Sequence, residues 1–270
     1  MNDEDHLHNF HSHTLRCKHA LGEVKEYCQV AVDRGMKTLG ISDHMPWPDD
    51  RWNASRMDYA ELEDYSKEID QAKIDFPEIK ILKGMECEYD AEYRAWFDDE
   101  LLGKYQFEYL VGGVHMFLDG DRWCNTYKHV KTAARLKLFA DATIEMMETG
   151  LFDFIAHPDL FGVDYTDWDA DAIACSRDIL SAAVDLDIGL EINALGLRKQ
   201  GKQEPGDPLP LYPWRPFWEE ATHYDIKVIV NSDAHRPVDL QNRTGDALKI
   251  ATELNLTMMD VSTIGTRVAK

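Results

Sequence analysis

The stretch Val228-Ile229-Val230-Asn231-Ser232-Asp233-Ala234-His235 shows the pattern that decides the fold: an apolar run ends in side chains that can bind a metal ion. Six earlier segments repeat this pattern, and they read Asn9-Phe10-His11-Ser12-His13, Leu39-Gly40-Ile41-Ser42-Asp43-His44, Leu82-Lys83-Gly84-Met85-Glu86, Leu110-Val111-Gly112-Gly113-Val114-His115, Phe152-Asp153-Phe154-Ile155-Ala156-His157 and Ile188-Gly189-Leu190-Glu191-Ile192-Asn193. Short runs of Val, Ile and Leu that are bounded by turn residues and separated by helical stretches are typical of buried parallel strands. The sequence therefore predicts an α/β fold.

The residues at the ends of these runs predict one shared site. In α/β barrels the carboxyl ends of the strands meet at one rim, where the chemistry takes place. Six of the eleven histidines stand at predicted strand ends, together with two carboxylates: His11, His13, His44, His115, His157 and His235, with Glu86 and Asp233. A single histidine at such a position is more often a hydrogen-bonded structural residue, but placement at so many strand ends favours a metal site.

Helical patterns fill the gaps between the runs, over residues 22–34, 58–76, 131–149, 169–185, 213–224 and 242–254. Gly35 is expected to cap the first of these helices, and Asp58 with Glu61 has the spacing of a capping box at the start of the second. Strand and helix alternate to the end of the chain without a break in composition, so we expect a single domain over residues 1–270.

Two long loops with aromatic residues are expected, over residues 45–57 and 196–218. The second holds five prolines. Loops of this kind at a catalytic rim often shape a pocket, and the alternative is a rigid cover without ligand contact.

Composition narrows the class of protein. A formal net charge of −21, from 50 acidic and 29 basic residues, disfavours binding to nucleic acid or an anionic membrane. A small anionic substrate remains compatible with this charge, because bound metal ions can make the site locally positive. No apolar stretch is long enough to cross a bilayer, and the acidic N-terminus does not resemble a signal peptide. Five scattered cysteines argue against a disulfide framework. We expect a cytoplasmic protein; its oligomeric state is open.

The ordered motif set resembles that of the PHP (polymerase and histidinol phosphatase) superfamily. It comprises H-x-H at His11 and His13, a further histidine at His19, and S-D-H, G-M-E, G-G-V-H, I-A-H-P and N-S-D-A-H further along the chain. The segment E-I-N-A-L-G-L-R-K, from Glu191 to Lys199, further resembles the histidinol-phosphate phosphatase branch. The resemblance implies a distorted (β/α)7 barrel with its metal site at the C-terminal ends of the strands, which agrees with the seven runs.

The resemblance also implies three divalent metal ions. One would take His11, His13, Glu86 and Asp233; a second would share Glu86 and add His115 and His157; a third would take His19, His44 and His235. Ligation by imidazole and carboxylate suits zinc, manganese or iron. Family members often have Asp two residues before the first ligand, where this chain has Asn9. Cys17 and Cys87 stand near ligands and are interpreted as bystanders.

The expected activity is metal-assisted hydrolysis of a phosphomonoester, with L-histidinol phosphate as the substrate that the resemblance implies. Glu86, Asp233 and His235 would hold the catalytic ions, and Arg198 would bind phosphate, with Arg236 as a weaker candidate. Glu191 and Asn193 would either hold an amine or imidazole of the substrate or orient metal ligands. Asp43 would either orient a ligand or donate a proton to the leaving group.

Two other functions remain open from the sequence. The chain could be a PHP enzyme that acts on a different small ester, such as a sugar or nucleotide phosphate. It could also be a metal-binding module without catalysis, although the complete ligand set argues against this. The four other histidines, His6, His8, His129 and His223, are interpreted as solvated or ordinary structural residues.

Overall fold

The computed structural model describes residues 7–200 and 212–266, and the chain divides into two compact units. Unit 1 comprises Met1–Val111, Asn231–Asn242 and Ser262–Lys270, and unit 2 comprises Gly112–Val230 and Arg243–Val261. His6 and the 201–211 part of the expected proline-rich loop lie outside the described residues. Within the described residues, no helix combines the length and the apolar character needed to span a membrane.

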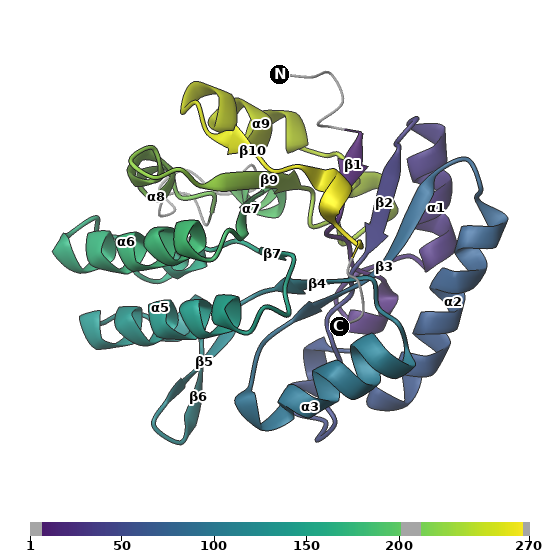
Figure 1. Cartoon of the computed structure of the whole chain (residues 1–270), viewed down its shortest axis with the longest axis horizontal. Coiled ribbons are helices and arrows are strands. Elements are labelled where there is room, and N and C mark those ends of the chain that lie inside the picture. The colour runs from purple at the N-terminus through teal and green to yellow at the C-terminus, as the bar shows by residue number, and fades with distance from the viewer. Residues whose placement is uncertain (1–6, 201–211, 267–270) are drawn as a thin grey trace. The chain divides into compact units, whose positions relative to one another are not determined.

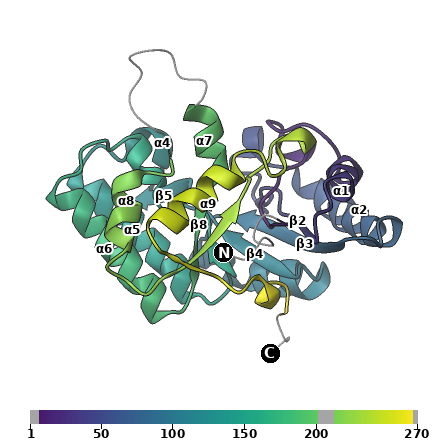
Figure 2. The ribbon, with the colours of Figure 1, turned by 90° about the horizontal axis from the view of Figure 1, so that it is seen from above.

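Unit 1 is built on neighbouring strands in the order β1 (His8–Asn9), β2 (Thr38–Ile41), β3 (Lys80–Cys87) and β4 (Tyr109–Gly112). The pairs β1–β2 and β2–β3 are parallel, with Thr38 opposite both His8 and Lys80. The strands are joined by α1 (Val24–Asp33) and α2 (Leu62–Asp75), which contact each other and the strands (Figures 1 and 2). Every residue of β2 is buried, as expected for a strand of a parallel sheet.

One tyrosine explains two glycines in the strands of unit 1. The hydroxyl of Tyr109 donates a hydrogen bond of 2.9 Å to the carbonyl of Phe10, just before the first H-x-H residue. A Cβ atom at Gly40 or Gly84 would lie 2.1 Å from an atom of the Tyr109 side chain, so neither position has room for a larger residue. The glycine of the G-M-E motif is therefore required by packing, because the tyrosine ring fills the space beside it.

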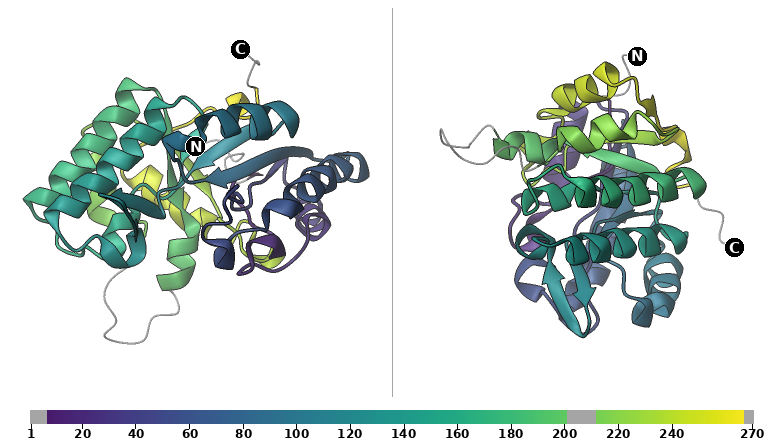
Figure 3. Two further views of the ribbon diagram at one scale, coloured as in Figure 1. Left: turned by 90° about the horizontal axis from the view of Figure 1, so that it is seen from below. Right: turned by 90° about the vertical axis from the view of Figure 1, so that its left-hand side faces the viewer.

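Unit 2 has a second set of neighbouring strands, in the order β7 (Phe154–Ile155), β8 (Gly189–Asn193), β9 (Lys227–Asn231) and β10 (Thr257–Met258). The pairs β7–β8 and β9–β10 are parallel. Its helices are α4 (Thr126–His129), α5 (Ala133–Glu148), α6 (Ala170–Asp185), α7 (Ala194–Gln200), α8 (Arg215–Ala221) and α9 (Thr244–Glu253). Helices α5 and α6 lie side by side, and α8 contacts α6 (Figures 1 and 3).

The helices predicted from the sequence are present as α1, α2, α5, α6, α8 and α9. Gly35 has the expected left-handed backbone, with φ of 66°, and the capping box of Asp58 and Glu61 is formed. The prediction of a loop from residue 196 is wrong at its start, because α7 continues to Gln200. Leucine, arginine and lysine favour a helix there, and the Asn193 side chain accepts a hydrogen bond of 2.8 Å from the Leu195 amide at its start.

Several elements were not predicted. Besides α4 and α7, they include the antiparallel hairpin of β5 (Met116–Asp119) and β6 (Arg122–Asn125), seen in Figure 3, the short strand β10, and the helical segment formed by α3 (Arg94–Trp96) and the π-helical turn Phe97–Lys104. The hairpin had a local signal, because its two-residue turn is Gly120-Asp121, a Gly-Asp pair that favours hairpins, and Gly120 has a φ angle of 64°. A two-residue strand such as β10 has no such signal.

Candidate metal centre

The ligands of the H-x-H motif reach their positions because the end of β1 is bound to the chain segment that follows β9. Ser12 and Ala234 form an isolated parallel bridge, and the amide of His13 donates a hydrogen bond of 2.8 Å to the carbonyl of Ala234. Ser12, which lies between His11 and His13, is therefore directly beside Ala234, which lies between Asp233 and His235. Two segments more than 200 residues apart in sequence place four potential ligands together.

Asn9 fixes this junction, although it is not a ligand. Its side-chain amide donates a hydrogen bond of 2.9 Å to the carbonyl of His11, and its Oδ1 atom accepts hydrogen bonds from the amide and hydroxyl of Ser232 at 2.7 and 2.8 Å. Asparagine can act as donor and acceptor at once, whereas an ionised Asp would have no donor for the His11 carbonyl. Asn9 thus orients the backbone next to both pairs of predicted ligands, His11 with His13 and Asp233 with His235.

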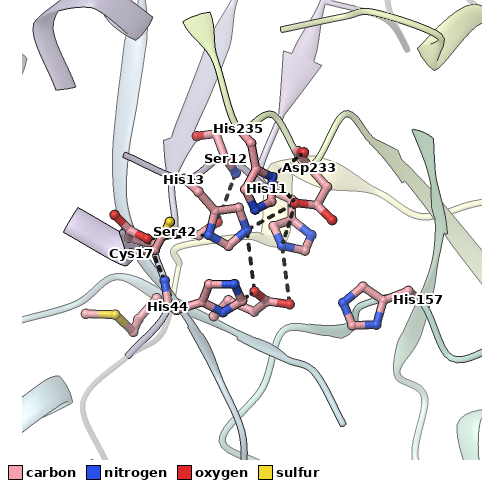
Figure 4. A network of polar contacts seen from close by, with 12 residues as sticks. His11, Ser12, His13, Cys17, Ser42, His44, His157, Asp233 and His235 are labelled. Atoms are coloured by element: carbon pink, nitrogen blue, oxygen red, sulfur yellow. Dashed lines mark hydrogen bonds and ion pairs between the residues drawn. The ribbon is translucent and has the colours of Figure 1, made fainter. Parts of the chain in front are cut away.

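Four predicted ligands form the buried centre of the cluster: His11, His13, Glu86 and Asp233. The Nε2 atom of His13 lies 3.1 Å from Oδ1 of Asp233 and 3.4 Å from Oε2 of Glu86. The Nε2 atom of His11 lies 3.4 Å from Oε1 of Glu86 and 3.7 Å from Oδ1 of Asp233. Figure 4 shows His11, His13 and Asp233 directed toward one another. The structure therefore brings together the complete ligand set expected for one ion.

The S-D-H and G-M-E motifs meet at a second isolated bridge. His44 pairs with Glu86 in a parallel bridge, and the His44 Nδ1 atom lies 2.8 Å from Oε2 of Glu86. The ring centroids of His44 and His13 are 4.3 Å apart. His44 therefore lies against the same carboxylate that faces His11 and His13.

His19 and His235 also lie near His13. The ring of His235 is 4.4 Å from that of His13 and 5.0 Å from that of His19, between centroids. Cys17, predicted to be a bystander, is fully buried, and its Sγ atom lies within 4.8 Å of donor atoms of His19 and His235. The described part of unit 1 thus offers a thiol beside the imidazoles expected for the third ion.

The carboxylates set the proton affinities of the imidazoles. Burial opposes protonation of His13, but Asp233, Asp43 and Glu86 outweigh it and raise the pKa of His13 to about 9. Burial, together with the charge on His13, lowers the pKa of His235 to about 3. The pKa of Asp233 is held well below its usual value, because the nearby His11, His13 and His235 outweigh the effect of burial. Without a metal ion, one proton on His13 therefore balances part of the carboxylate charge.

Asp43 supports His13. Its Oδ2 atom accepts hydrogen bonds from the amide and hydroxyl of Thr14, its Oδ1 atom accepts one of 2.9 Å from the amide of His44, and Oδ1 lies 3.5 Å from Nδ1 of His13. A fully buried carboxylate with these contacts can hold the ring of His13 while the other ring nitrogen faces the cluster.

The backbone at Asp233 is strained. Its φ angle is 47°, in the left-handed region that a residue with a Cβ atom rarely adopts. Such conformations cost about 1–3 kcal/mol and persist where the surroundings enforce them, typically at functional sites. The bridge at Ala234 and the hydrogen bonds of Asn9 enforce it here.

Unit 2 holds the remaining predicted ligands. The ring centroids of His115 and His157 are 4.8 Å apart. The amide of His157, which has a φ angle of 33°, donates a hydrogen bond of 3.2 Å to Oε2 of Glu191, and the same oxygen accepts one of 2.7 Å from Asn193. Glu191 and Asn193 are fully buried, and these contacts hold the predicted ligand His157 and start α7.

The two arginines predicted to bind phosphate lie in different settings. Arg198 is on α7 and is partly exposed, in unit 2. The side chain of Arg236 is half exposed and forms an ion pair of 2.8 Å with Asp239.

An ion pair that no sequence motif predicts borders the cluster of unit 1. Arg56, in the 45–57 loop, pairs with Glu88, and both side chains are buried. The pKa of His44 is lowered well below its usual value, first by burial and then by the charge on Arg56. A neutral imidazole is the form that binds metal. No local pattern predicts a pair between residues 32 positions apart.

The donor atoms of unit 1 fit a divalent metal ion. Ligand atoms of one zinc ion lie about 2.0–2.3 Å from the metal, and therefore at most about 4.6 Å from one another. Donor sets within 4.8 Å include His11 with His13 and Asp233, His13 with His44 and His235, and Cys17 with His19 and His235. Neither ring nitrogen of the buried His13 has a hydrogen-bond partner among the described residues. A buried nitrogen without such a partner, facing carboxylates, is what a cation would satisfy.

Comparison with known proteins gives relatives along most of the chain. A protein of Deinococcus radiodurans named "Probable histidinol-phosphatase" is 28% identical over 246 residues, which cover 88% of this chain and 90% of that protein. A solved structure from Listeria monocytogenes has a TM-score of 0.71 at 19% identity and covers 88% of this chain and 99% of its own. The structure of histidinol phosphate phosphatase from Lactococcus lactis, complexed with zinc, L-histidinol and phosphate, has a TM-score of 0.67 at 17% identity, over 93% of this chain and 95% of its own.

The likeness to the solved structures confirms the predicted α/β fold, a distorted barrel of the TIM type. The model of the PHP domain matches residues 9–195, well over half of the 270 residues. This chain therefore belongs to the PHP domain family.

Proposed function

We propose that this protein is a metal-dependent phosphomonoesterase that hydrolyses L-histidinol phosphate to L-histidinol and phosphate. The observation that carries the proposal is the buried cluster around His13, whose Nε2 atom faces the carboxylates of Glu86 and Asp233 but has no hydrogen-bond partner among the described residues. The choice of substrate is supported by the Deinococcus relative that is named a histidinol-phosphatase and by the Lactococcus structure with L-histidinol and phosphate.

The cofactor in this proposal is a set of three divalent ions, zinc, manganese or iron. His11, His13, Glu86 and Asp233 would hold one ion, Glu86 with His115 and His157 a second, and His19, His44 and His235 a third. The zinc in the Lactococcus structure and the donor sets of unit 1 support divalent metal binding. Bound ions of this kind supply a hydroxide nucleophile at neutral pH and stabilise charge on the phosphoryl group.

Residues around the ligands would keep the site in order. Asp43 would orient His13, which its short contacts with Thr14 and His44 support over the alternative of a proton donor. Glu191 would hold the backbone of His157, and Asn193 would hold Glu191, which leaves these two as positioning residues more than as substrate contacts. Arg198 stays a candidate for phosphate binding, and Arg236 is disfavoured by its ion pair with Asp239.

We further propose that the chain acts as one domain, in the cytoplasm, on a small phosphorylated substrate and not on nucleic acid. The net charge of −21 and the scattered cysteines support this proposal.

The test is a panel of phosphomonoesters, with histidinol phosphate, sugar phosphates and nucleotides, assayed on protein loaded with Zn, Mn or Fe. Selective release of phosphate from histidinol phosphate is expected, with loss of activity after chelation and return on adding metal. Preference for another ester would show that histidinol phosphate is not the substrate. Inactivity of fully metal-loaded protein on the whole panel would support the alternative of a metal-binding module without catalysis.

A further inference from the structure

Arg56 lies at the edge of the metal centre of unit 1, although nothing in the sequence motifs marks it. Its partner Glu88 stands two residues after Glu86 at the end of β3, and residues two apart on an extended chain point to the same side. Arg56 is 5% exposed, the same fraction as the predicted ligand His44. The guanidinium is therefore held close to the ligands and is as buried as His44.

The donor groups of Arg56 are only partly used. Nη1 donates to the carbonyl of Ser55 at 2.8 Å and to its hydroxyl at 3.3 Å, and Nη2 donates to Glu88. The buried Nε atom has no hydrogen-bond partner among the described residues. A guanidinium has five N–H donors, and leaving one buried and unsatisfied is unfavourable. The unused donor indicates that this side chain accommodates a further acceptor.

The charge of Arg56 reaches the ligands. It contributes to the lowered pKa of His44 after burial, and to that of His19 after burial and the charge on His13. Burial opposes the charge of Arg56, but Glu88, followed by Glu86 and Cys17, raises the pKa of Arg56. No arginine or lysine of the described residues has a larger effect on the pKa values of His44 and His19 than Arg56. A lasting positive charge therefore lies beside the metal centre in a strongly acidic chain.

We propose that Arg56 is a phosphate-binding residue, held by Glu88 so that its free N–H donor contacts an oxygen of a phosphoryl group at the metal centre of unit 1. This inference rests on the proposed function, because it takes the ligand to be a phosphomonoester or inorganic phosphate. Guanidinium suits this task, since its planar donors match phosphate oxygens and it keeps its charge at any physiological pH. Glu88 is a positioning residue that sets the orientation of the Arg56 guanidinium.

The experiment measures binding of inorganic phosphate to metal-loaded protein by calorimetry, with metal content determined on each sample. Arg56→Met is expected to weaken phosphate binding about 10- to 100-fold, because a charge-assisted hydrogen bond is lost. Arg56→Lys should retain part of the affinity, because it keeps the charge without the fork. Arg51→Met is the matched control: Arg51 is in the same loop and forms ion pairs of 2.7 Å with Asp49 and Asp90, 4.7 Å from the centre of the Trp47 ring.

The outcomes separate phosphate binding from support of the loop. Weakened phosphate binding in Arg56→Met, with full metal content and unchanged affinity in Arg51→Met, supports the inference. Unchanged affinity in Arg56→Met, or an equal loss in Arg51→Met, overturns it. If Arg56→Met fails to fold, the phosphate affinity of Arg56→Lys decides. Partial affinity with full metal content supports the inference, and unchanged affinity or loss of metal overturns it. If the unaltered protein binds phosphate through Arg56 but does not hydrolyse histidinol phosphate, the proposed substrate fails and this inference stands.

Discussion

The Nδ1 atom of His44 lies 2.8 Å from the Oε2 atom of Glu86, across an isolated bridge that joins the two chain segments. The same carboxylate lies 3.4 Å from ring nitrogens of both His11 and His13. Glu86 is therefore the residue of unit 1 on which imidazoles from different segments converge.

Substitution of Glu86 by Ala should remove more activity than substitution of His19 by Ala. Loss of one supporting contact at a metal site typically costs about 10- to 100-fold, and Glu86→Ala should exceed this range because the carboxylate serves several ligands. The measurement is kcat/KM together with metal content of each variant. Equal residual rates in two folded variants would contradict a bridging role for Glu86.

Metal affinity should rise with pH up to about 9. The carboxylates raise the pKa of His13 to about 9, so a metal ion must displace a proton below that pH. Competition with a chelator should show an affinity that increases about tenfold per pH unit between pH 7 and 9 and then levels off. The stability of the metal-free protein should change in the opposite direction and fall as pH rises. The stabilisation from charged His13 is fully present below about pH 6.5 and is lost as pH rises through 9. Urea unfolding with chelator present checks this second part.

Asp43→Asn should reduce metal affinity more than the rate of the loaded enzyme. The carboxylate of Asp43 lies 3.5 Å from Nδ1 of His13 and helps to raise its pKa, so the amide should leave His13 less well oriented and less basic. A loss of about 10- to 100-fold in metal affinity is expected, measured by chelator competition. A fall in kcat with unchanged metal affinity would instead assign Asp43 as the proton donor.

Asp159→Ala should destabilise unit 2. The Oδ2 atom of Asp159 accepts hydrogen bonds of 2.5 Å from the amide of Trp214 and 2.8 Å from the indole of Trp218. Burial raises the pKa of Asp159 to about 6, against the effect of these donors. The alanine variant leaves two buried N–H groups without their acceptor, at a cost of about 1–3 kcal/mol each. Urea unfolding followed by tryptophan fluorescence measures the loss, and an unchanged midpoint would show that other acceptors replace the carboxylate.

The strand ends could be predicted because buried parallel strands leave a strong local signal. Runs such as Val228–Val230 are apolar on both faces, and a polar ligand directly after the run marks the point where the strand stops. The motif set then supplied the expected ligand groups, and the structure brings His11, His13, Glu86 and Asp233 together.

Contacts between distant segments could not be predicted in the same way. The Arg56–Glu88 pair joins a loop to a strand end, and each residue alone looks like a solvated surface charge. The place of Cys17 depends on the turn Leu15–Cys17, whose buried thiol faces inward although its neighbour Arg16 pairs with Glu68. Only tertiary packing distinguishes these residues from ordinary charged or apolar ones.

The ring of Tyr109 between Gly40 and Gly84 has a consequence for how such a chain can change. Any side chain at either glycine would displace the ring and break its hydrogen bond to Phe10, so the three positions are expected to vary only as a group. Alanine at either glycine is therefore expected to shift the backbone at the histidine that follows Phe10, and so to loosen the cation site.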